Sequence, residues 1–227
     1  MREPQNTAAF FDLDRTLLAK SSGDLFIRHL RQNGHIRPSG LVKLIMASVL
    51  YRLNLLKPEG TMDRLALQYR GQAEQDMIDF GQQWFQETVK NYLYSEAVER
   101  VKEHQTKGHI VALLTAATFY IANPTNRFLN IHHCLCTRME IEGKLLTGKI
   151  VKPICHGEGK LYYARQFCET QGIDLANCYF YTDSIRDLPT LKAVGHPRPV
   201  NPDRPLLRTA RKYGWPVEFF SGTLGGA

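Results

Sequence analysis

The stretch that decides the fold is AAFFDLDRTLL, which spans residues 8–18. Residues 8–13 form an apolar run of the kind that is typical of a strand buried on both faces of a parallel sheet. Asp12 and Asp14 come at the end of that run, and Thr16 follows them. Open α/β sheets bind ligands beyond the carboxyl ends of their strands, so the two carboxylates occupy the position of a binding site. Their mutual repulsion is relieved if a divalent cation lies between them.

Similar short runs recur along the chain, which indicates a sheet built from several buried strands. Residues 110–114 and 178–181 are continuous apolar runs, and a weaker candidate surrounds residues 199–201. Helical patterns over residues 95–108 and 160–172 separate these runs, and a glycine ends each helix. Alternating strands and helices predict an α/β fold with a doubly wound, Rossmann-like parallel sheet.

Residues 20–94 have a different character, since they contain no convincing strand. Their patterns predict four helices, over residues 24–33, over residues 41–56, after a cap at Thr61, and over residues 77–89. The helix over residues 41–56 is apolar on nearly all sides, which favours a core or oligomer contact over a membrane-surface contact. Because the insertion directly follows the first strand, we predict an all-helical cap at residues 20–94 on a core of residues 1–19 and 95–227.

The composition limits the classes of partner and compartment. The 227 residues carry 29 Lys and Arg against 22 Asp and Glu, and the net charge of +7 suits an anionic partner or serves solubility alone. The five cysteines are odd in number and irregularly spaced, which favours a reducing compartment over a disulfide framework. The longest apolar stretch, residues 41–56, is shorter than the roughly 20 residues of a spanning helix. We therefore expect a soluble, cytoplasmic protein without a transmembrane segment.

A second acidic cluster, Asp183 and Asp187, follows the apolar run at residues 178–181. At this spacing the two carboxylates fall on one side of a turn that enters a helix. Alone, such a pair is more often the solvated start of a helix. Together with Asp12 and Asp14, it makes an all-oxygen site of the kind that Mg²⁺ prefers. We therefore predict Mg²⁺ as the cofactor and these four aspartates as its candidate ligands.

Two further residues complete a site for a phosphate group. Thr115 ends the run at residues 110–114, so its hydroxyl and the N–H groups after it face the carboxyl edge of the sheet. Lys160 follows a glycine pair and opens a helix, from which its ammonium group can neutralise an oxyanion. A P-loop is excluded, because Leu161 stands where that motif needs Ser or Thr.

The combination of these motifs resembles the haloacid dehalogenase superfamily and, more narrowly, its phosphoserine-phosphatase-like subfamily IB hydrolases. The matching motifs are Asp12-x-Asp14-x-Thr16, Thr115, Lys160 within GEGK, and Asp183-Ser184-x-x-Asp187 within DSxxDLPxL. The VNPD tail at residues 200–203 and GWP at residues 214–216 also fit, as does a helical cap between the first two motifs. The resemblance covers essentially the whole chain.

The resemblance implies a role for each motif residue. Asp12 would be the nucleophile that attacks phosphorus and becomes an aspartyl-phosphate. Asp14 would protonate the leaving alkoxide and then deprotonate the attacking water, while its backbone carbonyl binds Mg²⁺. Asp183 would bind the metal directly, and Asp187 would hold either a metal-bound water or the lysine. The strand-end threonine and the helix-opening lysine would hold the phosphoryl oxygens.

The substrate-binding part of the family pattern matches less well. Phosphoserine phosphatases place a Glu nine residues after the nucleophile to bind the substrate's amino group, whereas Ser21 occupies that position here and Ser22 follows it. An arginine that these enzymes carry in the cap corresponds to Arg64 in an ungapped alignment. We therefore take Ser21, Ser22 and Arg64 as candidate substrate-binding residues, and the sequence does not favour phosphoserine as the substrate.

Two other clusters of residues are more typical of a structural role than of a binding site. His132, His133, Cys134 and Cys136 include zinc-ligand types, but the extended pattern over residues 137–140 favours buried thiols beside a surface histidine pair. The basic residues between positions 198 and 212 lack interleaved aromatic residues, which favours a solvated surface over nucleic-acid binding.

These patterns predict a Mg²⁺-dependent phosphatase that hydrolyses a small phosphorylated metabolite through an aspartyl-phosphate. A homodimer is compatible with the apolar helix, and no nucleic-acid partner is expected. Two alternatives stay open. A phosphotransferase of the same fold would pass the phosphoryl group to an alcohol other than water. A non-catalytic basic module would bind nucleic acid or a membrane surface, although every charged group that the mechanism needs is present.

Overall fold

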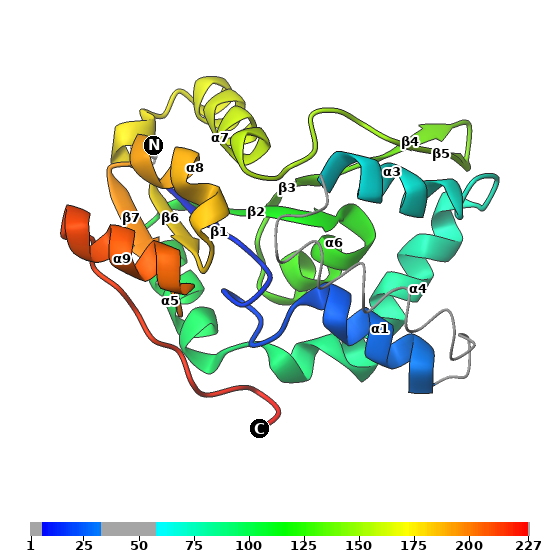
Figure 1. Cartoon of the computed structure of the whole chain (residues 1–227), viewed down its shortest axis with the longest axis horizontal. Helices are drawn as coiled ribbons and strands as arrows, with labels where there is room; N and C mark the ends of the chain where they lie inside the picture. Colours follow the sequence, from blue (N-terminus) through cyan, green and yellow to red (C-terminus); the bar gives the residue numbers. More distant parts are fainter. Residues whose placement is uncertain (1–5, 33–57, 227) are drawn as a thin grey trace.

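A parallel sheet of five strands forms the centre of the structure (Figure 1), a computed structural model that describes residues 6–32 and 58–226. The strands lie in the order β3-β2-β1-β6-β7, and each neighbouring pair is parallel. Their bounds are β1 (Ala8–Phe11), β2 (Ile110–Thr118), β3 (His133–Thr137), β6 (Tyr179–Thr182) and β7 (His196–Pro199). The predicted α/β fold with a Rossmann-like parallel sheet is confirmed.

Strand β1 is central because its side chains are apolar on both faces. Phe11 packs on one face, where its ring stacks on Tyr181 with 4.4 Å between ring centroids. Phe10 packs on the other face, with its ring edge against Phe167. Every residue of β1 is buried, so the strand needs a layer of helices on each side of the sheet.

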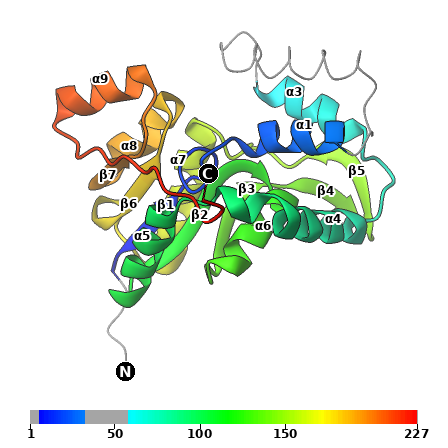
Figure 2. The same cartoon turned by 90° about the horizontal axis from the view of Figure 1, so that it is seen from below.

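Helices supply these two layers (Figure 2). The apolar cluster around Phe11 includes residues of α5 (Ser95–Thr106) and α6 (Phe119–Phe128). The cluster around Phe10 includes residues of α7 (Glu158–Gln171), α8 (Leu188–Ala193) and α9 (Arg204–Tyr213). Two short 3-10 helices, η2 (Leu175–Asn177) and η3 (Ile185–Asp187), flank β6. The helices predicted over residues 95–108 and 160–172 are confirmed.

The strand ends differ from those predicted. Strand β1 ends before Asp12, β2 continues past residue 114 to Thr118, and the strand predicted around residues 199–201 lies earlier, at β7. Strand β3 is not among the predicted strands, because a histidine and two cysteines in its five residues obscure the apolar run. Cys136 is buried in this strand and all five cysteines are free thiols, as the structural interpretation of that cluster expects.

A small antiparallel hairpin, β4 (Met139–Glu142) and β5 (Leu145–Ile150), lies outside the main sheet. It pairs with the loop after α3 (Pro58–Leu67), because the N–H of Leu146 donates to the carbonyl of Gln72 at 2.9 Å. Met139 and Leu146 share an apolar cluster with Ala66 of α3 and Tyr120 of α6. The hairpin therefore joins the helices of the insertion to the core, although its residues lie in the part of the chain that the sequence assigns to the core.

The described part of residues 20–94 is helical. It contains α1 (Ser22–Gln32), α3, α4 (Glu74–Glu87) and the 3-10 helix η1 (Val89–Tyr92). Helix α3 begins at Pro58, so the prediction that Thr61 caps it is wrong: the proline at the first helical position starts the helix earlier. The helix predicted over residues 41–56 lies outside the described residues. No helix in the described part of the chain is both long and apolar enough to cross a membrane.

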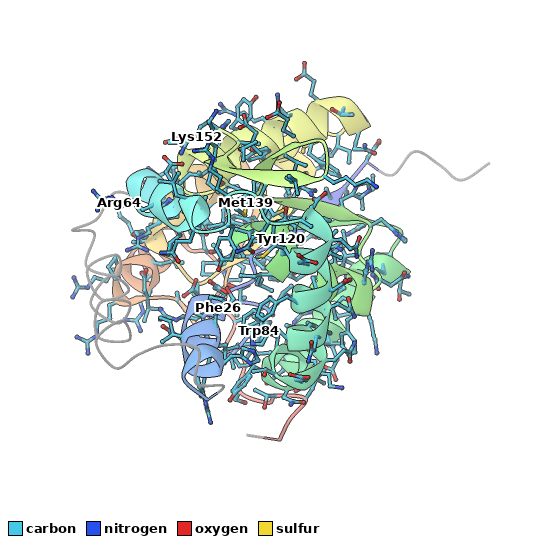
Figure 3. All side chains as sticks on the ribbon, turned by 90° about the vertical axis from the view of Figure 1, so that its right-hand side faces the viewer. Phe26, Arg64, Trp84, Tyr120, Met139 and Lys152 are labelled. Carbon is cyan, nitrogen blue, oxygen red and sulfur yellow. The ribbon has the colours of Figure 1, made fainter. Side chains whose placement is uncertain are left out.

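Helix α4 joins the insertion to the core through close packing (Figure 3). A Cβ atom added at Gly81 would lie 2.0 Å from the carbonyl oxygen of Tyr120, so only glycine allows the backbones of α4 and α6 to approach this closely. Three residues along α4, the ring of Trp84 lies 5.7 Å from that of Phe26, a residue of α1. The site-facing start of α1 is thus held against α4, and α4 against the core.

The C-terminal segment crosses the start of α5 and is bound there by one carboxylate. Glu96 Oε1 accepts hydrogen bonds from the N–H groups of Ser221, at 2.8 Å, and Gly222, at 3.1 Å. Burial raises the pKa of Glu96, but these N–H groups outweigh it and lower the pKa from 4.5 to about 2. The folded state therefore binds the Glu96 proton less tightly than the unfolded state does.

We predict that Glu96→Gln lowers the free energy of unfolding by about 1 kcal/mol at pH 7, because the segment loses a charged acceptor. Since the folded pKa is depressed, this stabilisation is fully present above pH 4.5 and is lost as the pH falls towards about 2. Urea titrations of both proteins at several pH values measure the difference. Glu99→Gln, on the exposed side of the same helix, is the control. A difference that stays constant across this pH range contradicts the assignment.

Candidate active site

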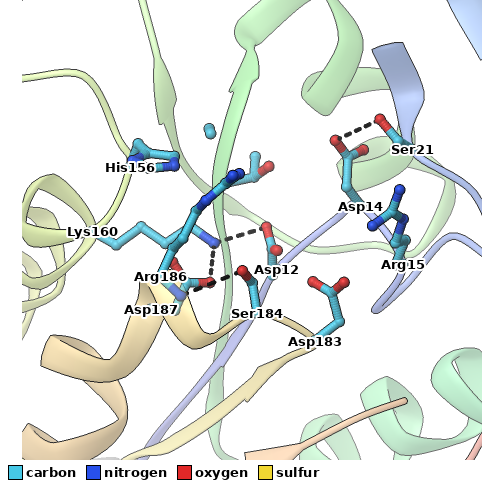
Figure 4. A pocket seen from close by; sticks show the side chains of 12 residues that line it. Asp12, Asp14, Arg15, Ser21, His156, Lys160, Asp183, Ser184, Arg186 and Asp187 are labelled. Atoms are coloured by element: carbon cyan, nitrogen blue, oxygen red, sulfur yellow. Dashed lines mark hydrogen bonds and ion pairs between the residues drawn. The ribbon is translucent and has the colours of Figure 1, made fainter. Parts of the chain in front are cut away.

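The carboxyl ends of three neighbouring strands open onto one cavity. Asp12 follows β1, Thr115 lies in β2, and Asp183 follows β6. The register of parallel pairing brings these ends together at one edge of the sheet. A cavity of about 140 Å³ lies there (Figure 4), lined by Asp12, Asp14, Arg15, Ser21, Thr115, Ala116, His156, Lys160, Asp183, Ser184, Arg186 and Asp187.

A buried ammonium group ties two of the carboxylates together. Lys160 Nζ lies 2.9 Å from Asp12 Oδ1 and 2.7 Å from Asp187 Oδ2, and all three side chains are almost completely buried. Asp187 Oδ2 also accepts a hydrogen bond from the hydroxyl of Thr182 at 2.5 Å. Asp12 Oδ1 accepts a second hydrogen bond from the N–H of Leu13 at 2.8 Å. The ends of two strands, β1 and β6, and the start of α7 are therefore linked through a single lysine.

The loop before α7 delivers this lysine. Helix α7 begins at Glu158, so Lys160 lies in its first turn and its side chain extends back towards the sheet. A Cβ atom at Gly159 would lie 1.8 Å from the carbonyl oxygen of Ile154, which means that the loop passes too close for any other residue. Close packing therefore requires glycine at position 159, the second residue of the glycine pair before Lys160.

Asp14 is held by the start of the insertion. Its Oδ1 accepts a hydrogen bond from the N–H of Ser22 at 2.8 Å, and Ser22 is the first residue of α1. The helix start favours a negative charge there, because its N–H groups are unpaired within the helix. The hydroxyl of Ser21 lies at 3.5 Å from Asp14 Oδ2. The two serines therefore orient a carboxylate, a role that the sequence comparison does not suggest.

Asp203 positions the loop that carries Asp183. The N–H of Asp203 donates to the carbonyl of Asp183 at 2.8 Å, and its Oδ2 accepts from the N–H of Ile185 at 3.0 Å. Its Oδ1 accepts from the N–H of Leu206 and so caps α9. The sequence analysis misses this role. An Asp directly before an Arg-Pro helix start is the N-cap pattern that could have drawn attention to it.

Burial changes the acidity of the aspartates around the cavity. Burial raises the pKa of Asp12 to about 7, with Lys160 acting in the opposite direction. Burial raises the pKa of Asp183 to about 8, and the charge of Asp12 adds to the effect. The pKa of Asp14 is also raised by burial. Burial alone would lower the pKa of Lys160, but Asp12 and Asp187 raise it above its ordinary value. The cluster thus carries more negative charge than one lysine offsets.

The donor set fits a small hard cation with few protein ligands. Across residues 6–32 and 58–226, no three or more His, Cys, Asp or Glu side chains are arranged to bind one ion. Asp12 and Asp183 face the same space, whereas Asp187 is occupied by Lys160 and Thr182 (Figure 4). Two carboxylates and a backbone carbonyl leave coordination positions for water and phosphate oxygens, which is how Mg²⁺ is usually bound.

Most of the predicted site residues come together in this cavity. Asp12, Asp14, Ser21, Thr115, Lys160, Asp183 and Asp187 line it, and Ser22 lies directly behind Asp14. Arg64 does not line it: this residue lies on α3 with an exposed side chain (Figure 3), and its role in substrate binding stays a prediction. The lining also contains Arg15, His156, Ser184 and Arg186, to which the sequence analysis gives no role.

Comparison with known proteins gives consistent matches over most of the chain. A family model described as haloacid dehalogenase-like hydrolase matches residues 9–192. A probable phosphatase of Mycobacterium tuberculosis is 34% identical over 219 residues, which cover 95% of this chain and 76% of that protein. A solved protein of unknown function from Bordetella pertussis matches with a TM-score of 0.86 at 26% identity, over 94% of this chain and 98% of that one. A phosphoserine phosphatase holding a phospho-aspartyl intermediate analogue shares the fold, with a TM-score of 0.69 at 16% identity over 97% and 96% of the two chains.

We predict that Lys160→Met lowers the free energy of unfolding by about 3 kcal/mol at pH 7, measured without divalent cations. The reason is that Asp12 and Asp187 lose their shared cation while they remain buried. Lys160→Met/Asp187→Asn should recover part of the loss, since one of the two unpaired charges is then gone.

Lys149→Met is the matched control. The Lys149 side chain is 72% exposed and lies 3.6 Å from Glu140, so its loss should change the free energy of unfolding by less than about 0.5 kcal/mol. Chemical denaturation of the four proteins gives these values. A Lys160→Met protein as stable as the unsubstituted chain would show that the buried bridge does not organise the site.

Proposed function

The chain belongs to the haloacid dehalogenase-like hydrolase family and is a phosphatase, and we propose that it hydrolyses a small phosphomonoester with Mg²⁺ through a phosphoryl group carried on Asp12. The observation that carries the proposal is the position of Asp12. Its carboxylate lines the cavity, and the ammonium group of Lys160 lies 2.9 Å from Oδ1. An anionic nucleophile needs such screening before it can approach an anionic phosphate.

Asp12 is oriented for attack by its hydrogen bonds. Leu13 N–H and Lys160 both bind Oδ1, so the carboxylate plane is fixed and, in the part of the chain that the structure describes, no protein donor binds Oδ2. In the first step an oxygen of Asp12 forms a bond to phosphorus while the bond from phosphorus to the ester oxygen breaks. Lys160 favours the ionised form of Asp12, since it opposes the rise in pKa that burial causes.

Asp14 moves the proton in both steps. Burial raises its pKa, which favours the protonated form that donates to the leaving ester oxygen. The ionised Asp14 then removes a proton from the water that attacks phosphorus, and the bond between phosphorus and Asp12 breaks. The N–H of Ser22 holds the carboxylate in one orientation throughout, which suits a group that must reach the same side of the phosphorus twice.

Thr115 and Lys160 bind the phosphoryl oxygens. Thr115 Oγ1 accepts a hydrogen bond from the N–H of Ala117 at 3.2 Å, so its own proton is free to be donated to a phosphoryl oxygen. The positive charge of Lys160 offsets the negative charge on the phosphoryl oxygens while bonds to phosphorus form and break. Bound Mg²⁺ would polarise the phosphoryl group and offset the charge of the carboxylates. Asp12, Asp183 and the backbone carbonyl of Asp14 would hold it.

The remaining parts of the proposal concern the setting of the site. Residues 20–94 form a cap on the core of residues 1–19 and 95–227, and the buried start of α1 places the cap beside Asp14. A cap over the cavity excludes water during the first step and admits it for the second. The substrate is a small phosphorylated metabolite, and no nucleic-acid partner is required. A cytoplasmic location and a homodimer stay predictions.

We predict that the protein hydrolyses 4-nitrophenyl phosphate with Mg²⁺ and loses this activity with a chelator. Asp12→Asn should lower kcat by roughly 10³-fold or more, because the neutral amide is too weak a nucleophile to form the acyl phosphate. The isosteric change keeps the hydrogen bond from Leu13 to position 12, so the fold is retained. Asp76→Asn, an exposed residue of α4, is the matched control. Turnover that survives both the chelator and Asp12→Asn would refute the proposal.

A further inference from the structure

Arg15 has a backbone conformation that is unfavourable for its residue type. Its φ angle is 56°, in the left-handed region that glycine and asparagine adopt more readily than a residue with a long side chain. Strained backbone positions of this kind cluster at catalytic and ligand-binding sites. The position follows Asp14 directly and belongs to the lining of the cavity. The arginine therefore calls for an explanation in terms of binding.

The Arg15 guanidinium lies on the leaving-group side of the cavity. Figure 4 shows it beside Asp14 and on the far side of Asp12 from Lys160. Its charge lowers the pKa values of Asp14 and Asp183 against the larger effect of burial, which agrees with this placement. Because Asp14 is the proposed proton donor to the ester oxygen, a group on the alcohol part of the substrate comes close to Arg15.

The described partner of Arg15 leaves the guanidinium available. Its Nη2 lies 4.0 Å from Asp24 Oδ2, and the two side chains are 45% and 37% exposed. An exposed ion pair at this distance contributes little and is readily exchanged for another anion. Lys160, in contrast, is buried and committed to Asp12 and Asp187, so it cannot serve the alcohol part of the substrate.

From this geometry we propose that Arg15 determines specificity by binding a second oxyanion on the substrate, a carboxylate or a phosphate close to the ester oxygen. A guanidinium presents a planar pair of N–H donors that matches either group. The substrate class is then a phosphomonoester whose alcohol part is itself an anion. This inference rests on the proposed function, since it takes Asp14 as the residue beside the leaving oxygen.

The test uses three esters of equal carbon number: 2-hydroxyethyl phosphate, 2-phosphoglycolate and ethane-1,2-diol bisphosphate. Their alcohol parts end in a hydroxyl, a carboxylate and a phosphate. For each anionic ester, its kcat/KM divided by that of the hydroxyl ester gives a selectivity. We expect at least one selectivity to exceed 1 in the unsubstituted chain and to fall roughly tenfold or more in Arg15→Gln, mainly through KM. The ester affected identifies the oxyanion.

Two further variants separate binding from structure. Arg15→Gly suits the left-handed backbone, so it should fold at least as stably as the unsubstituted chain and still lose the selectivity. Arg165→Gln, on the exposed side of α7, should leave the selectivity unchanged. Equal selectivity in the unsubstituted chain, Arg15→Gln and Arg15→Gly would overturn the inference while the proposed function stands. Absence of Asp12-dependent turnover of all three esters and of 4-nitrophenyl phosphate would overturn both.

Discussion

The structure of the active site depends on one buried cation, the ammonium group of Lys160. It lies within 2.9 Å of a carboxylate oxygen of Asp12 and of Asp187, in a region where neither acid is accessible to solvent. Without it, the two buried carboxylates would have no counter-charge in this bridge. With it, the end of β1, the loop after β6 and the start of α7 are held in one arrangement. The ammonium group therefore screens the negative charge of Asp12, the proposed nucleophile.

The rest of the fold serves to bring this cation to its position. The apolar strand β1 places Asp12 at the carboxyl edge of a sheet that is covered on both faces. Gly159 allows the loop before α7 to pass against its first turn, so that Lys160 reaches the same edge. Asp203 holds the loop that carries Asp183 and caps α9. The catalytic groups are therefore mounted on strand ends and helix starts, whose geometry is more rigid than that of free loops.

The sequence alone predicts the core of the site well, because its chemistry is local. Asp12 and Asp14 end one apolar run, Asp183 follows another, and Thr115 lies in a third, so the strand order brings these residues to one edge of the sheet. Sequence patterns do not predict structure that depends on packing between segments far apart in the chain. The hairpin β4–β5 is stabilised by α3 and by Tyr120, which no local pattern reveals. The left-handed backbone of Arg15 also cannot be inferred from residue type.

A chemical trap can detect the proposed bond between phosphorus and Asp12. The protein is mixed with excess 4-nitrophenyl phosphate and Mg²⁺, quenched in acid during turnover, and treated with borohydride, which reduces an aspartyl-phosphate to homoserine. Peptide mass spectrometry then locates the change. The account predicts homoserine at position 12, unmodified Asp14, and no change in a sample without substrate. Homoserine at another aspartate, or none while the ester is being hydrolysed, would contradict it.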